Sequence, residues 1–175
     1  MKELLNKRYS VRKYTTEKVS KDYIDYILDC MLLSPSGKNK NPWEFIVVNN
    51  LELIKTLADS KKAGAKFLKD TQHVIVVVGD EAASDTWVED ASITLMVGHL
   101  AATTLELGSC WIQTRNREAE NEDSETYVKR VLGIPNRLRV LGMLSIGHPV
   151  QVTDREKSID PSKVFSDHYG TAFYE

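Results

Sequence analysis

The run Val74-Ile75-Val76-Val77-Val78 constrains the fold of this chain more than any other stretch of its sequence. A half-buried strand alternates apolar and polar residues, whereas a strand that is covered on both faces is apolar without interruption. We therefore expect this run to form a central strand of a sheet that carries packed elements on both sides.

The spacing of apolar residues elsewhere predicts the elements around this strand. Further strands are expected at 43–48, 109–114 and 138–146. The expected helices are 20–33 with Ser20 as N-cap, 51–58 after Asn50, 86–107 with Ser84 or Asp85 near its start and Gly108 as its stop, and 124–132 from Ser124 to Gly133. Because 1–42 is helical and loop-like before the first strand, about five helices and four strands do not alternate regularly. The sequence therefore predicts an α+β fold with a central mixed sheet surrounded by helices, not a doubly wound fold.

Size and composition limit the classes of protein to which the chain can belong. Its 175 residues correspond to one domain, 1–175. No apolar run reaches the ~20 residues of a membrane helix, so a membrane partner is not expected. Met1–Arg8 has no apolar stretch of the kind found in signal peptides. Cys30 and Cys110 are then expected as free thiols, which predicts a cytoplasmic protein.

The charge pattern favours a small anionic ligand over a nucleic acid. The formal net charge is −2, and proteins that coat nucleic acids usually carry a basic excess. Residues 1–21 nevertheless hold seven basic and two acidic side chains. Segments 80–90 and 118–125 each hold five acidic residues and no basic one, and we expect them to be solvated surface.

Several common catalytic motifs are missing from the sequence. It contains neither the G-x-G-x-x-G fingerprint nor the P-loop pattern G-x-x-x-x-G-K-[ST]. The four histidines lie far apart and none has zinc-ligand spacing with a cysteine, so no metal site is expected. Cys110 has no adjacent charged partner and is expected to be a buried structural residue.

The stretch Arg8-Tyr9-Ser10-Val11-Arg12 is the first that indicates a ligand. In an extended segment alternate side chains share a face, so Arg8, Ser10 and Arg12 would point together. Two guanidinium groups and a hydroxyl are suited to a phosphate dianion. The alternative is a solvated basic stretch near a terminus, and this segment taken alone favours that alternative.

The loop 34–43, with the sequence S-P-S-G-K-N-K-N-P-W, is the second informative stretch. Its prolines, glycine and Ser/Asn side chains form a loop rich in hydrogen-bonding groups, which could follow the edge of a flat polar heterocycle. The alternative is an ordinary helix-to-strand connection in which Trp43 anchors the core.

Together with Leu107–Gln113, Leu132–Pro135 and Ile146–Pro149, these two stretches resemble the FMN-dependent nitroreductase family. The matching motifs are R-x-S-x-R, P-S-x-x-N-x-x-P-W, G-S-C-W-I, L-G-I-P and G-x-P. They occur in the family's order over nearly the whole chain, and their combination is more specific than any one of them.

The resemblance implies a homodimer with FMN bound at the subunit interface and a C-terminal segment that reaches the partner subunit. It implies that the phosphate and ribityl chain are held by Arg8, Tyr9, Ser10 and Arg12, and that the isoalloxazine is bordered by Pro35, Ser36, Gly37 and Asn39 of the other subunit. Gln113 would approach the ring, and Arg155 and Lys157 would lie near the phosphate. Many members contact the flavin through an asparagine before the second strand, where this chain has Gly64-Ala65-Lys66.

The activity implied by the resemblance is transfer of a hydride from NAD(P)H through FMN to a nitroaromatic, quinone or related conjugated acceptor, in a ping-pong cycle. No side chain is expected to act as a catalytic acid, base or nucleophile, because the cofactor carries out the redox chemistry. The alternatives are a flavin-binding or sensing protein without turnover, and another flavin reaction on this fold, such as reductive dehalogenation or flavin fragmentation. A third alternative is a phosphate-binding module without flavin, which would use only the basic cluster at Arg8 and Arg12.

Overall fold

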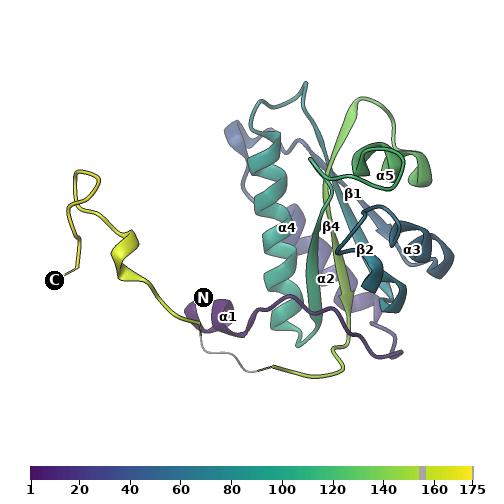
Figure 1. Ribbon diagram of the computed structural model, residues 1–175, viewed down its shortest axis with the longest axis horizontal. Coiled ribbons are helices and arrows are strands. Elements are labelled where there is room, and N and C mark those ends of the chain that lie inside the picture. The colour runs from purple at the N-terminus through teal and green to yellow at the C-terminus, as the bar shows by residue number, and fades with distance from the viewer. Residues whose placement is uncertain (154–156, 175) are drawn as a thin grey trace.

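The computed structural model describes residues 1–153 and 157–174, so Arg155 lies outside the described residues. Its centre is a four-stranded sheet with the strand order β1-β2-β4-β3 (Figure 1). The helices and strands are α1 Lys2–Lys7, α2 Lys21–Leu32, β1 Trp43–Val48, α3 Leu51–Leu57, β2 His73–Asp80, α4 Trp87–Thr104, β3 Gly108–Gln113, α5 Ser124–Leu132 and β4 Leu138–Gly147. Short 3-10 helices lie at Gly37–Asn39, Lys66–Asp70 and Pro161–Lys163.

Strand β2 is the inner strand that the apolar run predicts. The side chains from Val74 to Val78 are all 0% exposed, and β2 pairs with β1 on one side and β4 on the other. All three strand pairings are antiparallel. Among the described residues, the parallel component of the expected mixed sheet is limited to a single bridge between Ser10 and Ser109. The sequence could not predict that neighbouring strands pair antiparallel, because the spacing of apolar residues is the same for both strand directions.

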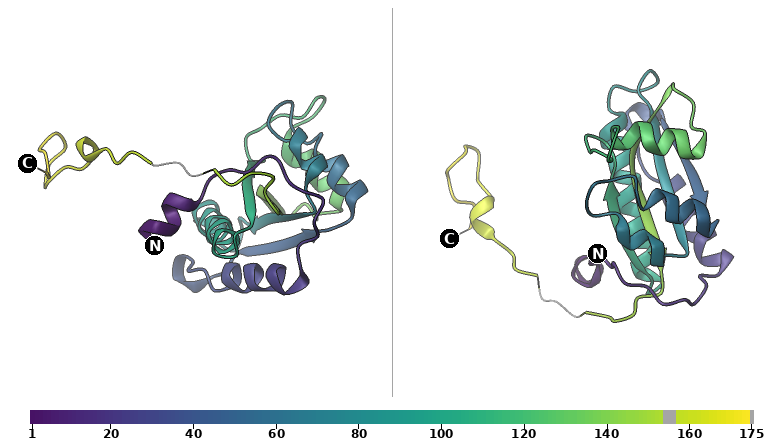
Figure 2. Two further views of the ribbon diagram at one scale, coloured as in Figure 1. Left: turned by 90° about the horizontal axis from the view of Figure 1, so that it is seen from below. Right: turned by 45° about the vertical axis from the view of Figure 1, so that its right-hand side comes forward.

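Helices cover both faces of the sheet (Figures 1 and 2). Apolar side chains of α2 and α4 pack on one face, together with Ile75 and Val77. Side chains of α3 and α5 pack on the other face, together with Val74, Val76 and Val78. Successive side chains of a strand point to opposite faces, so an uninterrupted apolar run supplies both cores. The α+β fold is confirmed.

The helix ends confirm most of the predicted boundaries. The side chains of Ser20 and Asn50 accept hydrogen bonds from backbone N–H groups in the first turns of α2 and α3. Gly133 ends α5 in the left-handed conformation, with φ 67°. The predicted cap at Ser124 is wrong, because the preceding carboxylate of Asp123 accepts the hydrogen bond from the N–H of Thr126.

The predicted end of α4 at Gly108 is also wrong. The helix ends at Thr104, and Glu106 takes the left-handed conformation (φ 58°) that leads the chain out of it. Gly108 is the first residue of β3, where a Cβ atom would lie 2.8 Å from Cγ1 of Val11. Glycine at this position therefore lets the segment after α1 approach β3 closely.

Two terminal segments lie outside the helical layers. The segment after α1 follows the start of β3, where the N–H of Val11 donates to the oxygen of Ser109 at 3.0 Å. The C-terminal segment extends away from the sheet and helices, and a bridge between Phe165 and Ala172 closes a turn near its end (Figures 1 and 2). Within the described residues, none of the helices is both long and apolar enough to cross a membrane.

Candidate functional site

A groove of about 680 Å³ lies between the segment after α1 and the chain that follows β4. Its lining includes Arg8, Ser10, Arg12 and Lys157. Arg8 has an extended backbone (φ −64°, ψ 125°), so the alternating pattern of this segment applies. The groove therefore contains the three residues predicted to share a face, together with Lys157, which the family resemblance also implies near the phosphate.

Arg8 contacts a buried histidine of α4. Its Nη1 atom lies 3.0 Å from Nε2 of His99, and Nδ1 of His99 lies 2.5 Å from Oγ of Ser109. His99 is 3% exposed. Burial and the adjacent guanidinium of Arg8 lower the pKa of His99 to about 4, so the imidazole is neutral near pH 7.

Lys157 connects the C-terminal segment to the groove. Its Nζ atom donates to the backbone oxygen of Arg8 at 2.5 Å and also to that of Leu5. These oxygens lie at the end of α1, where backbone carbonyls lack helical partners. Partial burial and the nearby Arg8 lower the pKa of Lys157.

Tyr9 and Arg12 each contact a part of the chain outside the segment 8–12. The hydroxyl of Tyr9 donates to the oxygen of Gln151 at 2.7 Å and accepts from the N–H of Thr153 at 3.2 Å. The guanidinium carbon of Arg12 lies 5.9 Å from the centre of the Phe67 ring. Tyr9 thus fixes the chain that follows β4. The side chain of Arg12 lies near the 3-10 helix Lys66–Asp70, which contains Phe67.

The loop before β1 lies at the other end of α4. The N–H of Gly37 donates to Oδ1 of Asp90 at 2.8 Å, near the start of that helix. At ~1.5 Å per residue, Asp90 and His99 are about 14 Å apart along the helix axis. The structure therefore does not bring to the groove of the same chain the predicted flavin-contacting residues of this loop, Pro35, Ser36, Gly37 and Asn39.

Hydrogen bonds and local backbone geometry fix the shape of that loop. Oγ of Ser36 donates to Oδ1 of Asn41 at 2.7 Å and accepts from the N–H of Asn41 at 2.9 Å. Lys38, Asn39 and Asn41 have φ values of 53°, 54° and 46°. Such left-handed residues are uncommon outside glycine and often occur at functional sites.

Gln113 lies at the far end of β3 from the groove. Its Oε1 accepts from Nε1 of Trp111 at 2.9 Å, and its Nε2 donates to the oxygen of Arg115 at 3.1 Å. At ~3.3 Å per residue, Gln113 is about 13 Å along the strand from Ser109, which adjoins the groove. The edge strand β3 therefore runs from the basic groove to Gln113.

Three side chains near these residues were missed by the sequence analysis. His99 and Asp90 contact Arg8 and Gly37 from α4, and Lys61 is half-buried near Gly64. Burial and the nearby Arg117 lower the pKa of Lys61. The contacts of His99 and Asp90 depend on packing between segments far apart in the sequence, so the sequence contains no local signal for them.

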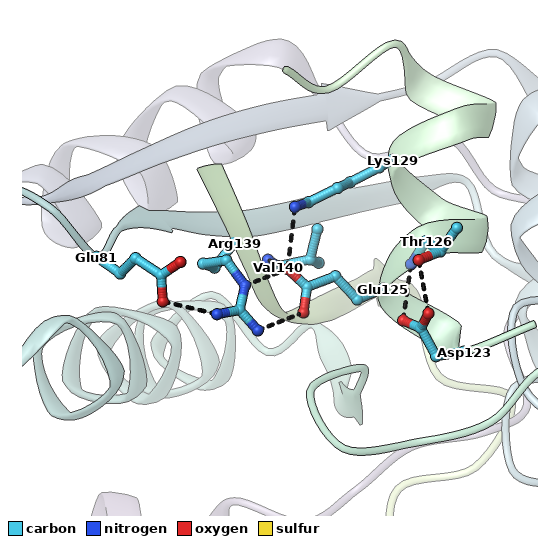
Figure 3. Close-up of polar contacts among 7 residues, drawn as sticks. All are labelled: Glu81, Asp123, Glu125, Thr126, Lys129, Arg139 and Val140. Carbon is cyan, nitrogen blue, oxygen red and sulfur yellow. Dashed lines mark hydrogen bonds and ion pairs between the residues drawn. The ribbon is translucent and has the colours of Figure 1, made fainter. Parts of the chain in front are cut away.

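The acidic segments 80–90 and 118–125 are not simply solvated surface, as the sequence analysis expected. Glu81 and Glu125 both pair with Arg139, at 2.6 Å and 2.8 Å, and Lys129 pairs with Glu125 at 3.2 Å (Figure 3). Burial raises the pKa of Glu125, but hydrogen bonds from Arg139 and the N–H of Val140 outweigh it and leave the pKa below its usual value. The two segments thus converge on Arg139 of β4, which is 58 residues from Glu81 and 14 residues from Glu125.

The donor set of the groove is suited to a phosphate group. Arg8 and Arg12 offer guanidinium donors, Ser10 offers a hydroxyl, and Lys157 offers an ammonium group. Among the described residues, no carboxylate lies within ion-pair distance of either arginine. In the same part of the chain, no three His, Cys, Asp or Glu side chains are grouped as metal ligands.

Comparisons with known proteins find similar sequences. The family model described as Nitroreductase family matches residues 5–97 and 55–148. A protein of Archaeoglobus fulgidus with the provisional name NADH dehydrogenase/NAD(P)H nitroreductase is 32% identical over 156 residues, which cover 87% of this chain and 87% of that protein. A protein of Methanothermobacter thermautotrophicus with the same name is 31% identical over 165 residues, which cover 93% of this chain and 84% of that protein.

The solved structures include a similar fold. The FMN-dependent nitroreductase of Clostridium difficile R20291 superposes with a TM-score of 0.93 and is 38% identical. The match covers 97% of this chain and 100% of that one. The similarity therefore extends over the sheet, the helices and the terminal segments.

Proposed function

The chain belongs to the nitroreductase family, and on that basis we propose that it is an NAD(P)H-dependent FMN oxidoreductase that acts as a homodimer of single-domain subunits, 1–175. The observation that carries this proposal is the groove in which Arg8, Ser10 and Arg12 meet. The donor groups of this groove are suited to the phosphate of FMN, and the similar Clostridium difficile enzyme is described as FMN-dependent.

In the proposed site, Arg8 and Arg12 bind the FMN phosphate, and Ser10 donates its hydroxyl. The backbone of Tyr9 continues this wall, and Lys157 contributes positive charge from the C-terminal segment. Arg155 is proposed to join Lys157 near the phosphate. The flavin ring would extend along β3 towards Gln113, because this edge strand leads away from the groove.

Two subunits are needed for this proposed site. The loop residues Pro35, Ser36, Gly37 and Asn39 precede β1, at the opposite edge of the sheet from β3, so they would border the flavin of the partner subunit. The C-terminal segment supports a dimer as well, because Ile159, Tyr169 and Phe173 are 74%, 94% and 58% exposed. Large apolar side chains exposed together on one segment usually mark an interaction surface.

Bound FMN would take up a hydride from NAD(P)H and pass the electrons to a nitroaromatic, quinone or related conjugated acceptor, in a ping-pong cycle with one shared stacking site. The protein's own residues would bind and orient the cofactor. Lys61 is positioned beside the segment 64–66, where it could supply positive charge near the ring in place of an asparagine. No side chain of this chain is proposed as a nucleophile or as a proton donor.

The proposal is tested by mixing the purified protein with FMN, removing unbound FMN and adding NADPH or NADH without oxygen. We expect the flavin absorbance to bleach, and to return when a nitroaromatic or quinone is added. Bound flavin that stays oxidised under both nicotinamides would instead favour a flavin-binding or sensing protein. A protein that retains no FMN would leave only a phosphate-binding module. The cytoplasmic location expected from the unpaired Cys30 and Cys110 stays a prediction.

A further inference from the structure

We infer that His99 is a positioning residue for the FMN phosphate, which holds the guanidinium of Arg8 in place without neutralising its charge. The inference rests on the proposed function, which assigns Arg8 to the phosphate. His99 contacts Arg8 but is not part of the groove lining, so it would act through Arg8 and not on the ligand.

The hydrogen-bonding capacity of the two side chains fixes the proton on the imidazole. Arginine can only donate hydrogen bonds, so the 3.0 Å contact requires Nε2 of His99 to be the acceptor. The proton of the neutral ring then lies on Nδ1, which donates to Oγ of Ser109 at 2.5 Å. Both ring nitrogens are used, and the imidazole is oriented from two sides.

The three residues come from three elements that pack together. His99 lies in the second half of α4, Arg8 directly follows α1, and Ser109 lies in β3. Ser109 pairs with Ile146 of β4, and its backbone oxygen accepts from the N–H of Val11. The sheet therefore supports Ser109, Ser109 supports the imidazole, and the imidazole supports Arg8.

The charge of the supporting group matters for a phosphate site. A carboxylate would also orient an arginine, but its negative charge would offset the attraction between that arginine and a dianion. Arg130, Arg137 and Arg139 of this chain do pair with carboxylates. A neutral imidazole instead fixes the guanidinium and leaves its full positive charge directed at the groove.

The backbone of Arg8 is held as well as its side chain. Lys157 donates to the oxygen of Arg8, while His99 accepts from its guanidinium. A long arginine side chain otherwise loses rotational freedom when it binds a ligand, and this loss is a free-energy cost of binding. Arg8 would meet this cost on folding, before the phosphate arrives.

The test compares the affinities of FMN and riboflavin, which differ by the phosphate, for His99→Leu and His99→Gln. We expect His99→Leu to weaken FMN binding by roughly tenfold, because the loss of a hydrogen bond to a charged group typically has an effect of about this size. Riboflavin binding should stay unchanged. Glutamine can accept from Arg8 and donate to Ser109, so His99→Gln should bind FMN within about threefold of the wild type.

Equal losses for FMN and riboflavin in His99→Leu would overturn the inference, because they indicate general damage to the fold. Unchanged FMN binding would overturn it too. Should His99→Leu fail to fold, Ser109→Ala takes its place, with a selective loss of FMN affinity expected and no selective loss contradicting the inference. Arg8→Ala separates the two levels: if this substitution weakens FMN and riboflavin binding equally, or weakens neither, the phosphate assignment itself fails, and with it the proposed site.

Discussion

The backbone N–H of Gly37 donates a 2.8 Å hydrogen bond to Oδ1 of Asp90, whose side chain is 3% exposed. The other carboxylate oxygen, Oδ2, accepts from Ser84 and Thr86. One buried side chain of α4 therefore fixes both the loop before β1 and the turn before the helix. In the proposed dimer, that loop is the part of the site that each subunit supplies to its partner.

Asp90→Ala should destabilise the protein by about 1.5–3 kcal/mol, because it leaves the half-buried N–H of Gly37 and two hydroxyls without their charged acceptor. Unfolding in urea, followed by circular dichroism, measures the change. Asp85→Ala is the control, since Asp85 is exposed in the same acidic segment. If both variants unfold at the same urea concentration as the wild type, Asp90 does not anchor the loop.

Glu125→Ala should also be strongly destabilising, by about 2–4 kcal/mol. The side chain of Glu125 is 12% exposed, and its loss leaves Arg139 and Lys129 without their shared partner (Figure 3). The matched control is Glu122→Ala, whose partner Arg130 is 61% exposed, so that its loss should cost less than about 1 kcal/mol. Thermal unfolding of the two variants measures the difference. Equal melting temperatures would contradict the role assigned to Glu125.

The stability of the protein should fall with acid through His99 in particular. The folded state holds the pKa of His99 at about 4, below its ordinary value of 6.5. Between these values the unfolded chain binds a proton that the folded chain does not, so stability that is complete above pH 6.5 is lost as the pH falls to 4. The loss is on the order of 3 kcal/mol.

His99→Gln has no such titration and isolates this effect from that of the carboxylates. Between pH 7 and pH 4, we expect the wild type to lose about 3 kcal/mol more unfolding free energy than His99→Gln loses. Both proteins are compared at equal FMN concentration. Urea unfolding of both proteins at the two pH values measures it. A difference that does not change with pH would show that His99 titrates normally.

Truncation after Lys157 should weaken the dimer and leave the groove-lining residues in place. It removes the exposed apolar side chains of the C-terminal segment, such as Tyr169 and Phe173, while Lys157 still bonds to Arg8. Analytical ultracentrifugation over a dilution series should give a dissociation constant at least tenfold higher than that of the full chain. A truncated protein that dimerises as tightly as the full chain would exclude this segment from the interface.

The parts of the fold that depend on local sequence could be predicted. The inner strand β2 and the caps at Ser20 and Asn50 follow from the side chains within a few residues of each. Gly108 was assigned to the end of α4 because glycine often terminates a helix. Its actual role, to admit Val11, depends on a segment that is far away in the sequence.

The same distinction applies to the candidate site. Arg8, Ser10 and Arg12 share one extended segment, so their convergence follows from alternation along a single stretch. His99 and Lys61 reach this region only through the packing of α4 and of the chain between α3 and β2. Contacts between distant elements cannot be predicted from a single sequence, because they require no particular spacing between the residues involved.

The most direct test of the account is a crystal structure of the protein with bound FMN. We predict that the phosphate lies within hydrogen-bonding distance of Arg8 and Arg12 of one subunit, and that the loop containing Gly37 of the other subunit borders the flavin ring. FMN bound elsewhere, or bound wholly within one subunit, would contradict the proposed site.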